Sequence, residues 1–329
     1  MEKFCVSIPK IELHAHLNGS LSRATLKDLG CLEEDVQIYN KSDIDLQTCF
    51  QLFSVAHKAT SDVNSVKYVT KQVIKEFADD NVLYLELRTT PREEQNMTEE
   101  EYIEAVVDGI TSHKSPIVVK LLLSLDRRRS IEEQRKTVKS IIKFKKLYPD
   151  IVKGIDLSGN PSFGEFYEDL FIEARYNGLF TAIHCAEIKN DIEAERILNF
   201  NPDRIGHGTF LHPESGGSQR LWQMNKMLQI PTEICLTSNV ICRTTKSYKE
   251  HHIQAWIKDE LPFSLCTDDK GVFNTSLSKE FFLAYQHLNL NREQLWKISR
   301  NSIDYSFASN REKQELRIKL KEWRQENMQ

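Results

Sequence analysis

The sequence lacks any long hydrophobic run, since no stretch reaches the roughly 18 consecutive apolar residues that a membrane-spanning helix needs. Residues 1–10 also lack the apolar core of a secretory signal. Glycine and proline are scarce, at 12 and 9 of 329 residues, which excludes collagen-like and low-complexity chains. We therefore expect an ordinary globular protein, located in the cytoplasm, that does not act on a membrane.

A strong net charge is missing as well, because 44 lysines and arginines stand against 48 aspartates and glutamates, a formal net charge of -4. A nucleic-acid-binding protein would need a clearly basic face, so we expect no nucleic-acid partner. The seven cysteines are scattered and never spaced Cys-x-x-Cys. Such a set is typical of buried, reduced thiols, and we expect Cys185 and Cys266 to fill the core.

Along the chain, short apolar runs alternate with longer helix-like segments. Continuous apolar runs of this length are typical of parallel strands that are covered on both faces, and the alternation favours an α/β fold with a parallel sheet. Eight runs are the number that closes a (β/α)8 TIM-like barrel, so we expect one such domain over residues 1–329. The runs are residues 10–17, 82–89, 117–125, 151–157, 180–185, 204–208, 231–236 and 263–267.

Two segments lie outside this alternation. About 60 residues separate the first two runs, which is more than one crossover needs. We expect extra helices there, including residues 46–59, over one mouth of the barrel. At the end of the chain, residues 310–329 are charged and carry Leu316, Leu320 and Trp323 at helical spacing, which predicts a C-terminal packing helix.

Polar side chains gather where the predicted strands end, which is where parallel α/β barrels build their active sites. His14 and His16 are two apart on the first strand and share a face. In a closed barrel the eighth strand adjoins the first, which places Asp268 beside this pair, and the fifth strand places His184 opposite. Three imidazoles and a carboxylate predict a site for one divalent ion, with zinc first and iron, manganese or cobalt still open.

Three further polar residues stand at the same strand ends. Glu187 follows His184 by three, so the chain must turn after Ala186 for both side chains to enter the mouth. His207 lies between two glycines, and Asp269 next to Asp268 would be costly to bury without a task. The remaining histidines fall in helix or loop segments, where we expect surface residues. They are His113, His212, His251, His252 and His287.

Five motifs carry a family resemblance. They read PKIELHAHLNGS at 9–20, HCAE at 184–187, IGHGT at 205–209, TSN at 237–239 and TDD at 267–269. In this order they resemble the adenosine deaminase family of metal-dependent aminohydrolases, across nearly the whole chain. The resemblance implies the (β/α)8 barrel and hydrolytic deamination of a purine at C6.

Within that family the chain is similar to the branch that deaminates N6-methyl-AMP. The similarity lies in LRTTPR at 87–92, LSLDRR at 123–128, DDKGVF at 268–273 and in Asn18, where most adenosine deaminases carry an aspartate. A neutral amide near the ribose 5′ position would not repel a phosphate, as a carboxylate would. Arg92 and the arginines at 127–129 could then bind a monophosphate, although a solvated loop is an equally good interpretation of that arginine run.

The resemblance also implies a role for each site residue. His14, His16, His184 and Asp268 would hold one Zn²⁺, which would activate a water as hydroxide. Glu187 would protonate N1, for which it needs a raised pKa, and His207 would orient the hydroxide. Asp269 would position the water or the purine. Substrate contacts are implied for His16, Asn18, His57, Thr89, Thr90, Pro91, Arg92, Asp126, Gly159 and Asp269.

The implied reaction converts N6-methyl-AMP and water into IMP and methylamine, and the implied partner is a purine nucleoside monophosphate bound by a monomer. A deaminase of unmodified adenosine or AMP would share every metal ligand, so it remains open. A two-metal amidohydrolase would usually carry a lysine at the end of the fourth strand, whereas Lys153 lies near its start. A catalytically inactive barrel that only binds a nucleotide is a further alternative.

Overall fold

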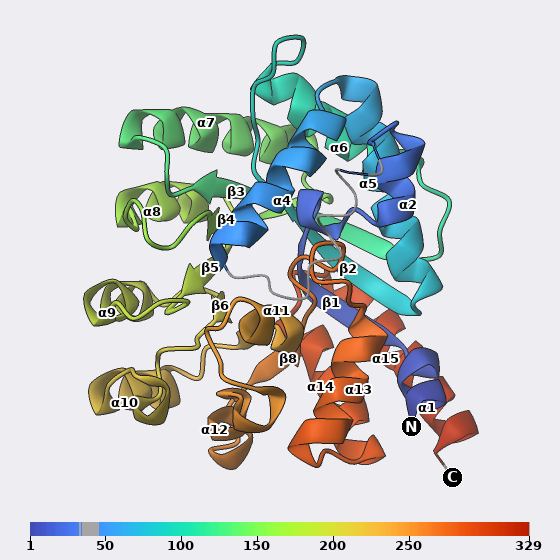
Figure 1. Ribbon diagram of the computed structural model, residues 1–329, viewed down its shortest axis with the longest axis vertical. Helices are drawn as coiled ribbons and strands as arrows, with labels where there is room; N and C mark the ends of the chain where they lie inside the picture. Colours follow the sequence, from blue (N-terminus) through green and yellow to red (C-terminus); the bar gives the residue numbers. More distant parts are fainter. Residues whose placement is uncertain (33, 35–45, 329) are drawn as a thin grey trace.

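Eight parallel strands form a barrel in a computed structural model that describes residues 1–32, 34 and 46–328 (Figure 1). Each strand pairs with the next in chain order. The ring closes where the His16 amide donates to the Asp268 carbonyl at 2.9 Å and the Asp268 amide donates to the His14 carbonyl at 2.8 Å. The strands are β1 (Lys10–His16), β2 (Val82–Thr89), β3 (Val118–Asp126), β4 (Val152–Ser158), β5 (Phe180–Cys185), β6 (Arg204–His207), β7 (Thr232–Ile234) and β8 (Phe263–Leu265). The predicted (β/α)8 barrel is confirmed.

Helices surround the barrel between the strands. Several begin at capping boxes, such as Thr98 with Glu101 and Ser130 with Glu133, which satisfy the free amides of the first turn. The helices are α1 (Glu2–Ser7), α2 (Arg23–Asp28), α4 (Leu46–Ala59), α5 (Val63–Asp79), α6 (Glu99–Ser112), α7 (Ile131–Leu147), α8 (Glu168–Tyr176), α9 (Asp191–Phe200), α10 (Gln219–Leu228), α11 (Leu236–Ile241), α12 (Ile253–Lys258), α13 (Leu277–Leu288), α14 (Arg292–Tyr305) and α15 (Asn310–Asn327). None of the helices in the described ranges is long and apolar enough to cross a membrane.

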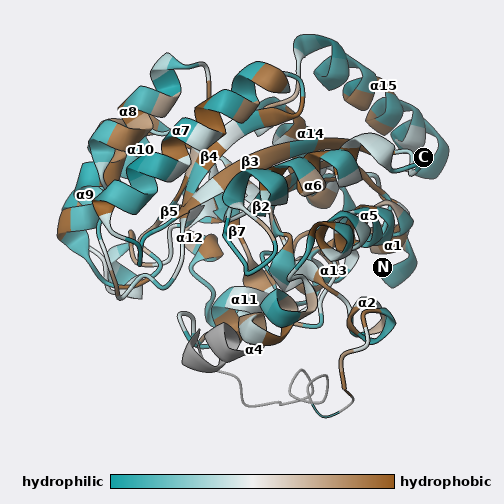
Figure 2. Cartoon of the chain, turned by 90° about the horizontal axis from the view of Figure 1, so that it is seen from above, coloured by the Kyte–Doolittle hydropathy of each residue, from teal (hydrophilic) through white to brown (hydrophobic). Residues whose placement is uncertain are grey.

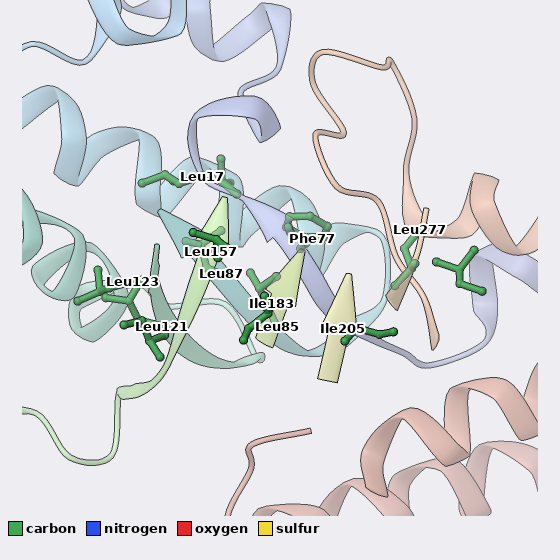
Figure 3. Close-up of a cluster of buried hydrophobic side chains, with 14 of the residues drawn as sticks. Leu17, Phe77, Leu85, Leu87, Leu121, Leu123, Leu157, Ile183, Ile205 and Leu277 are labelled. Carbon is green, nitrogen blue, oxygen red and sulfur yellow. The ribbon is translucent and has the colours of Figure 1, made fainter. Parts of the chain in front are cut away.

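The outward faces of the strands are apolar and pack against the helices. Leu85, Leu121, Leu157 and Ile183 are among these buried side chains (Figure 3). Because the side-chain period of a strand is two, the alternate residues point into the barrel. The expectation of near-continuously apolar strands therefore holds for the outward faces only, since the interior carries buried charged groups. Among them are Glu12, Glu86, Arg88, Asp156, Arg204 and Glu233.

The two additions to the barrel lie at opposite ends. Helix α4 crosses the face that Figure 1 presents, and Figure 2, turned by 90°, places α15 on the far side of the barrel. Leu316 and Leu320 of α15 are buried against Ile11 and Leu13 of β1. Both predicted additions are therefore present, one over each end of the barrel.

Candidate active site

A pocket of about 540 Å³ opens at the carboxyl ends of the strands. Residues from both the barrel and the inserted segment line it, including Phe53 and His57 of α4. Burial, together with the positive charges of Arg92 and Arg128, lowers the pKa of His57 to about 4, so its imidazole is neutral at physiological pH. The expected helix over the mouth thus forms part of the pocket wall.

Three histidines and one aspartate converge at the floor of this pocket. The Nε2 atoms of His14 and His16 are 3.2 Å apart, and those of His16 and His184 are 3.3 Å apart. Oδ1 of Asp268 lies 3.4 Å from Nε2 of His14 and 3.4 Å from Nε2 of His16. Ligands bound tetrahedrally to zinc at about 2.0–2.1 Å are separated from one another by roughly 3.3 Å. These four separations match those between ligands of one shared ion, and the ligand atoms of His14, His184 and Asp268 all lie within 4.8 Å of one another.

Two buried carboxylates fix the tautomers of His14 and His184. Nδ1 of His14 lies 2.9 Å from Oε2 of Glu233, and Nδ1 of His184 lies 2.9 Å from Oδ1 of Asp156. Because a carboxylate only accepts, each Nδ1 donates its proton and each Nε2 turns a lone pair toward the cluster. Both of these lone pairs face Nε2 of His16, and a proton on that atom could be donated to only one of them. The donor set therefore fits a cation at its centre.

Asp156 and Glu233 were not found by the sequence reasoning. Burial would raise the pKa of Asp156, but the facing His184 and Arg88 hold this pKa below its usual range. The sequence feature that could have identified them is a charged residue within a mostly apolar strand, at a position whose side chain faces the barrel interior. Such a residue is costly to bury unless it is paired.

Left-handed backbone conformations occur at or just after the ends of β5, β6 and β8. Ala186, His207 and Asp268 have φ values of 52°, 62° and 59°. A non-glycine residue in this region turns the chain sharply and costs energy, so it is typical of functional sites. The expected turn is present at Ala186, and it brings Glu187 into the same pocket as His184.

Glu187 and His207 lie beside the cluster of His14, His16, His184 and Asp268. Oε1 of Glu187 is 4.0 Å from Nε2 of His207, and burial raises the pKa of Glu187. Nδ2 of Asn239 donates to Nδ1 of His207 at 3.2 Å, so Nε2 of His207 carries the proton. Burial holds the pKa of His207 well below its usual value, which keeps the ring neutral. The neutral imidazole of His207, as a hydrogen-bond donor, and the carboxyl group of Glu187 thus line the same pocket.

Two histidines that we expected at the surface support this arrangement instead. His251 and His252 are buried, which corrects the sequence-based expectation. Nε2 of His252 donates to the carbonyl of His207 at 2.9 Å, and its Nδ1 contacts the Thr245 hydroxyl at 3.2 Å. A loop with little periodicity gave no sign that its histidines would fold inward.

Asn18 lies further out in the pocket, within a polar network. Its Nδ2 donates to the Tyr102 hydroxyl at 3.3 Å, and its Oδ1 accepts from the Thr60 hydroxyl at 3.4 Å. The Tyr102 hydroxyl also contacts Thr89 Oγ1 at 2.5 Å, and Arg92 donates to Thr60 Oγ1 at 2.7 Å. Neither Thr60 nor Tyr102 belongs to a motif that the sequence shows. Thr60 directly follows α4 and Tyr102 lies on α6, so the placement of these two helices brings them to Asn18.

The predicted arginines separate into two groups. Arg92, Arg128 and Arg129 line the pocket, whereas the Arg127 guanidinium is buried 3.2 Å from Glu193 and does not line it. The interpretation of all three consecutive arginines as phosphate contacts is therefore wrong for Arg127. Consecutive residues in a turn point in different directions, and sequence alone does not say which of them faces inward.

Most other predicted substrate residues also line this pocket. Pro91 is the exception, since it does not line the pocket. Its carbonyl accepts a hydrogen bond from Arg129 at 2.9 Å. Gly159 has φ +98°, and a Cβ there would lie 2.5 Å from Oδ1 of Asp126, so both the backbone and the space demand glycine. The predicted residues that the pocket brings together are His16, Asn18, His57, Thr89, Thr90, Arg92, Asp126, Gly159, His184, Glu187, His207, Asp268 and Asp269.

A (β/α)8 barrel with this cluster of imidazoles and carboxylates at the carboxyl ends of its strands has the layout of the metal-dependent barrel enzymes. A sequence profile described as adenosine deaminase matches residues 9–323. The chain is therefore a member of the adenosine deaminase family, as its motifs indicated.

Relatives and solved structures show which members of this family the chain is similar to. The chain is 44% identical to the human protein named N6-methyl-AMP deaminase, over 96% of this chain and 93% of that protein. It is 40% identical to an adenosine deaminase-like protein of Drosophila melanogaster, over 95% of each chain. A solved structure described as the ADAL–IMP complex superposes with a TM-score of 0.91 at 38% identity, covering 99% of this chain and 100% of that chain. The Arabidopsis N6-mAMP deaminase MAPDA gives a TM-score of 0.90 at 38% identity, covering 98% and 100%.

Proposed function

We propose that this protein hydrolyses N6-methyl-AMP to IMP and methylamine with one Zn²⁺ per chain. The main support is the layout of charge in the pocket. Its floor holds a cluster that fits a divalent ion, beside a protonatable acid, and its outer part holds a neutral amide, Asn18, near arginines. Relatives about 40% identical over nearly their full length carry the name of this activity.

His14, His16, His184 and Asp268 would hold the ion, and zinc suits a set of three imidazoles and one carboxylate. A zinc ion in that position would supply hydroxide at neutral pH. The imidazoles of His14 and His184 are kept in the ligating tautomer by the carboxylates behind them. The chain thereby supplies a pre-formed site, with little reorganisation left for binding.

Glu187 and His207 would handle the protons of the reaction. Burial raises the pKa of Glu187, which favours the protonated acid that would donate to N1 of the purine as water adds at C6. The Nε2–H of His207 would donate to the oxygen that gains negative charge at C6. The C6–N6 bond then breaks, N6 takes up a proton, and methylamine leaves. Water and N6-methyl-AMP are thus converted into IMP and methylamine.

The outer part of the pocket would select the monophosphate. Asn18 brings no negative charge, and Arg128 and Arg129 line the pocket. Asp126 pairs with Arg128 at 2.6 Å and so fixes the position of one of these groups. Charge-assisted bonds from arginine to phosphate are among the stronger and more directional contacts in proteins.

A substrate panel tests this proposal. Purified protein with a measured zinc content is given N6-methyl-AMP, AMP, adenosine and N6-methyladenosine, and the change in ultraviolet absorbance is followed. We expect the highest kcat/KM for N6-methyl-AMP and weak turnover of both nucleosides. A preference for adenosine or AMP would make the protein an ordinary deaminase. No turnover of any compound by zinc-loaded protein would favour the inactive barrel.

A further inference from the structure

The Arg88 side chain lies in the barrel interior beneath the proposed metal site, and it is fully buried. Its Nη1 donates to Oδ1 of Asp156 at 3.3 Å, and its Nη2 donates to Oε2 of Glu233 and, at 2.8 Å, to the carbonyl of Leu13. One guanidinium therefore links β2 to three other strands. Residues far apart in the chain are tied together at this point.

The oxygens that Arg88 contacts are the same ones that orient the histidines. Oε2 of Glu233 accepts from Nδ1 of His14, and Oδ1 of Asp156 accepts from Nδ1 of His184, each at 2.9 Å. Each oxygen is thus shared between an imidazole and the guanidinium. A shift of the guanidinium would move both carboxylates and, through them, both imidazoles.

We propose that Arg88 is a positioning residue that sets the geometry of the metal site by fixing the two carboxylates behind His14 and His184. The planar fork of arginine can donate to two carboxylates at once, which a single ammonium cannot do in the same geometry. Its positive charge also offsets the cost of burying Asp156 and Glu233 together. The inference rests on the proposed metal site and adds to it the residue that holds two of the proposed ligands, His14 and His184, in position.

Arg204 provides a matched control inside the same barrel. It is also fully buried, and its Nε donates to Glu233 at 2.6 Å, but to Oε1 and not to the oxygen that faces His14. Its other contacts are Glu86, the carbonyl of Tyr305 at 2.8 Å and the ring of Phe307 at 3.7 Å. Losing Arg204 removes one buried positive charge, as losing Arg88 does, without freeing a histidine-bound oxygen.

The experiment compares wild type with Arg88→Met, Arg88→Lys and Arg204→Met. Metal-free proteins are titrated with Co²⁺ while the visible absorption is recorded, and Zn²⁺ affinity is measured by competition with a chelator. Thermal unfolding of each metal-free protein reports stability separately. If Arg88→Met does not fold, Arg88→Lys carries the comparison, because it keeps the charge and loses the fork.

We expect Arg88→Met to weaken Zn²⁺ binding by about 10- to 100-fold and to change the Co²⁺ spectrum, as loss of a group behind the ligands does. Arg88→Lys should change the spectrum as well. Arg204→Met should lower stability to a similar extent while its spectrum stays that of wild type. Equal weakening in the Arg88 and Arg204 variants, or a wild-type spectrum in both Arg88 variants, overturns the inference. Failure of wild type to bind Co²⁺ or Zn²⁺ would instead overturn the proposed metal site.

Discussion

Gly19 lies where any side chain would displace Asp269. A Cβ built on Gly19 would be 1.6 Å from Oδ1 of Asp269, 2.3 Å from its Cγ and 2.7 Å from its Cβ. The φ angle of Gly19 is not in the left-handed region, so alanine can adopt the backbone conformation. The substitution Gly19→Ala therefore tests the position of the Asp269 carboxylate rather than strain in the turn.

The size of the effect follows from the distances. Ordinary van der Waals contact begins near 3.4 Å, so Oδ1 of Asp269 must retreat from 1.6 Å by about 1.8 Å. A misplacement of about 1 Å in an active site can cost about 100-fold in rate, or roughly 2.7 kcal/mol. We therefore expect Gly19→Ala to lower kcat/KM by at least about 100-fold while zinc stays bound.

The assay is a double-mutant cycle on kcat/KM with zinc content measured in every variant. In an Asp269→Gly background all three of these clashes are gone, so adding Gly19→Ala should cost little more. Gly178→Ala is the control for a change outside the pocket. Its φ of +76° should make alanine there lower stability, but its new Cβ would meet only Cε of Lys145, at 3.9 Å, so kcat/KM should stay that of wild type. A Gly19→Ala enzyme within about threefold of wild type, or additive losses in the cycle, would refute the reasoning about Asp269.

Four further predictions follow from other parts of the molecule. Glu187→Gln should bind zinc normally but lose at least about 100-fold in single-turnover rate, because the amide has no proton to give; a loss smaller than about tenfold would contradict the general-acid role. Asn18→Asp should raise KM for N6-methyl-AMP far more than for N6-methyladenosine, and equal increases would remove Asn18 from the specificity argument. Removing the metal with a chelator should lower Tm, and zinc at 100 times its Kd should restore about 2.7 kcal/mol of stability; an unchanged Tm would contradict a site that the folded chain alone provides. Leu320→Ala, in the fully buried contact of α15, should lower the free energy of unfolding by about 2–5 kcal/mol in a denaturant titration and leave kcat/KM unchanged; a parallel loss of activity would mean that this end of the barrel communicates with the pocket.

Much of the proposed site could be placed from the sequence because a parallel barrel brings all strand ends to one rim. That rule put His184 opposite His14 and Asp268 beside it, and the structure has them in one cluster. The rule says nothing about which residue of a turn faces inward. Arg127 therefore points to Glu193, and the Pro91 side chain takes no part in the pocket lining.

The sequence by itself determined the alternation of strands and helices, the strand ends that carry the chemistry, and the family motifs. These features depend on local periodicity and on the order of residues, which can be seen before the chain folds. The tertiary structure decided the rest. Arg88 meets Glu233 across 145 positions of sequence, and Tyr102 reaches Asn18 across 84, only because the barrel closes and α6 packs against it. Burial then decides which charges must be paired, and that pairing fixes the direction in which the imidazoles of His14 and His184 point.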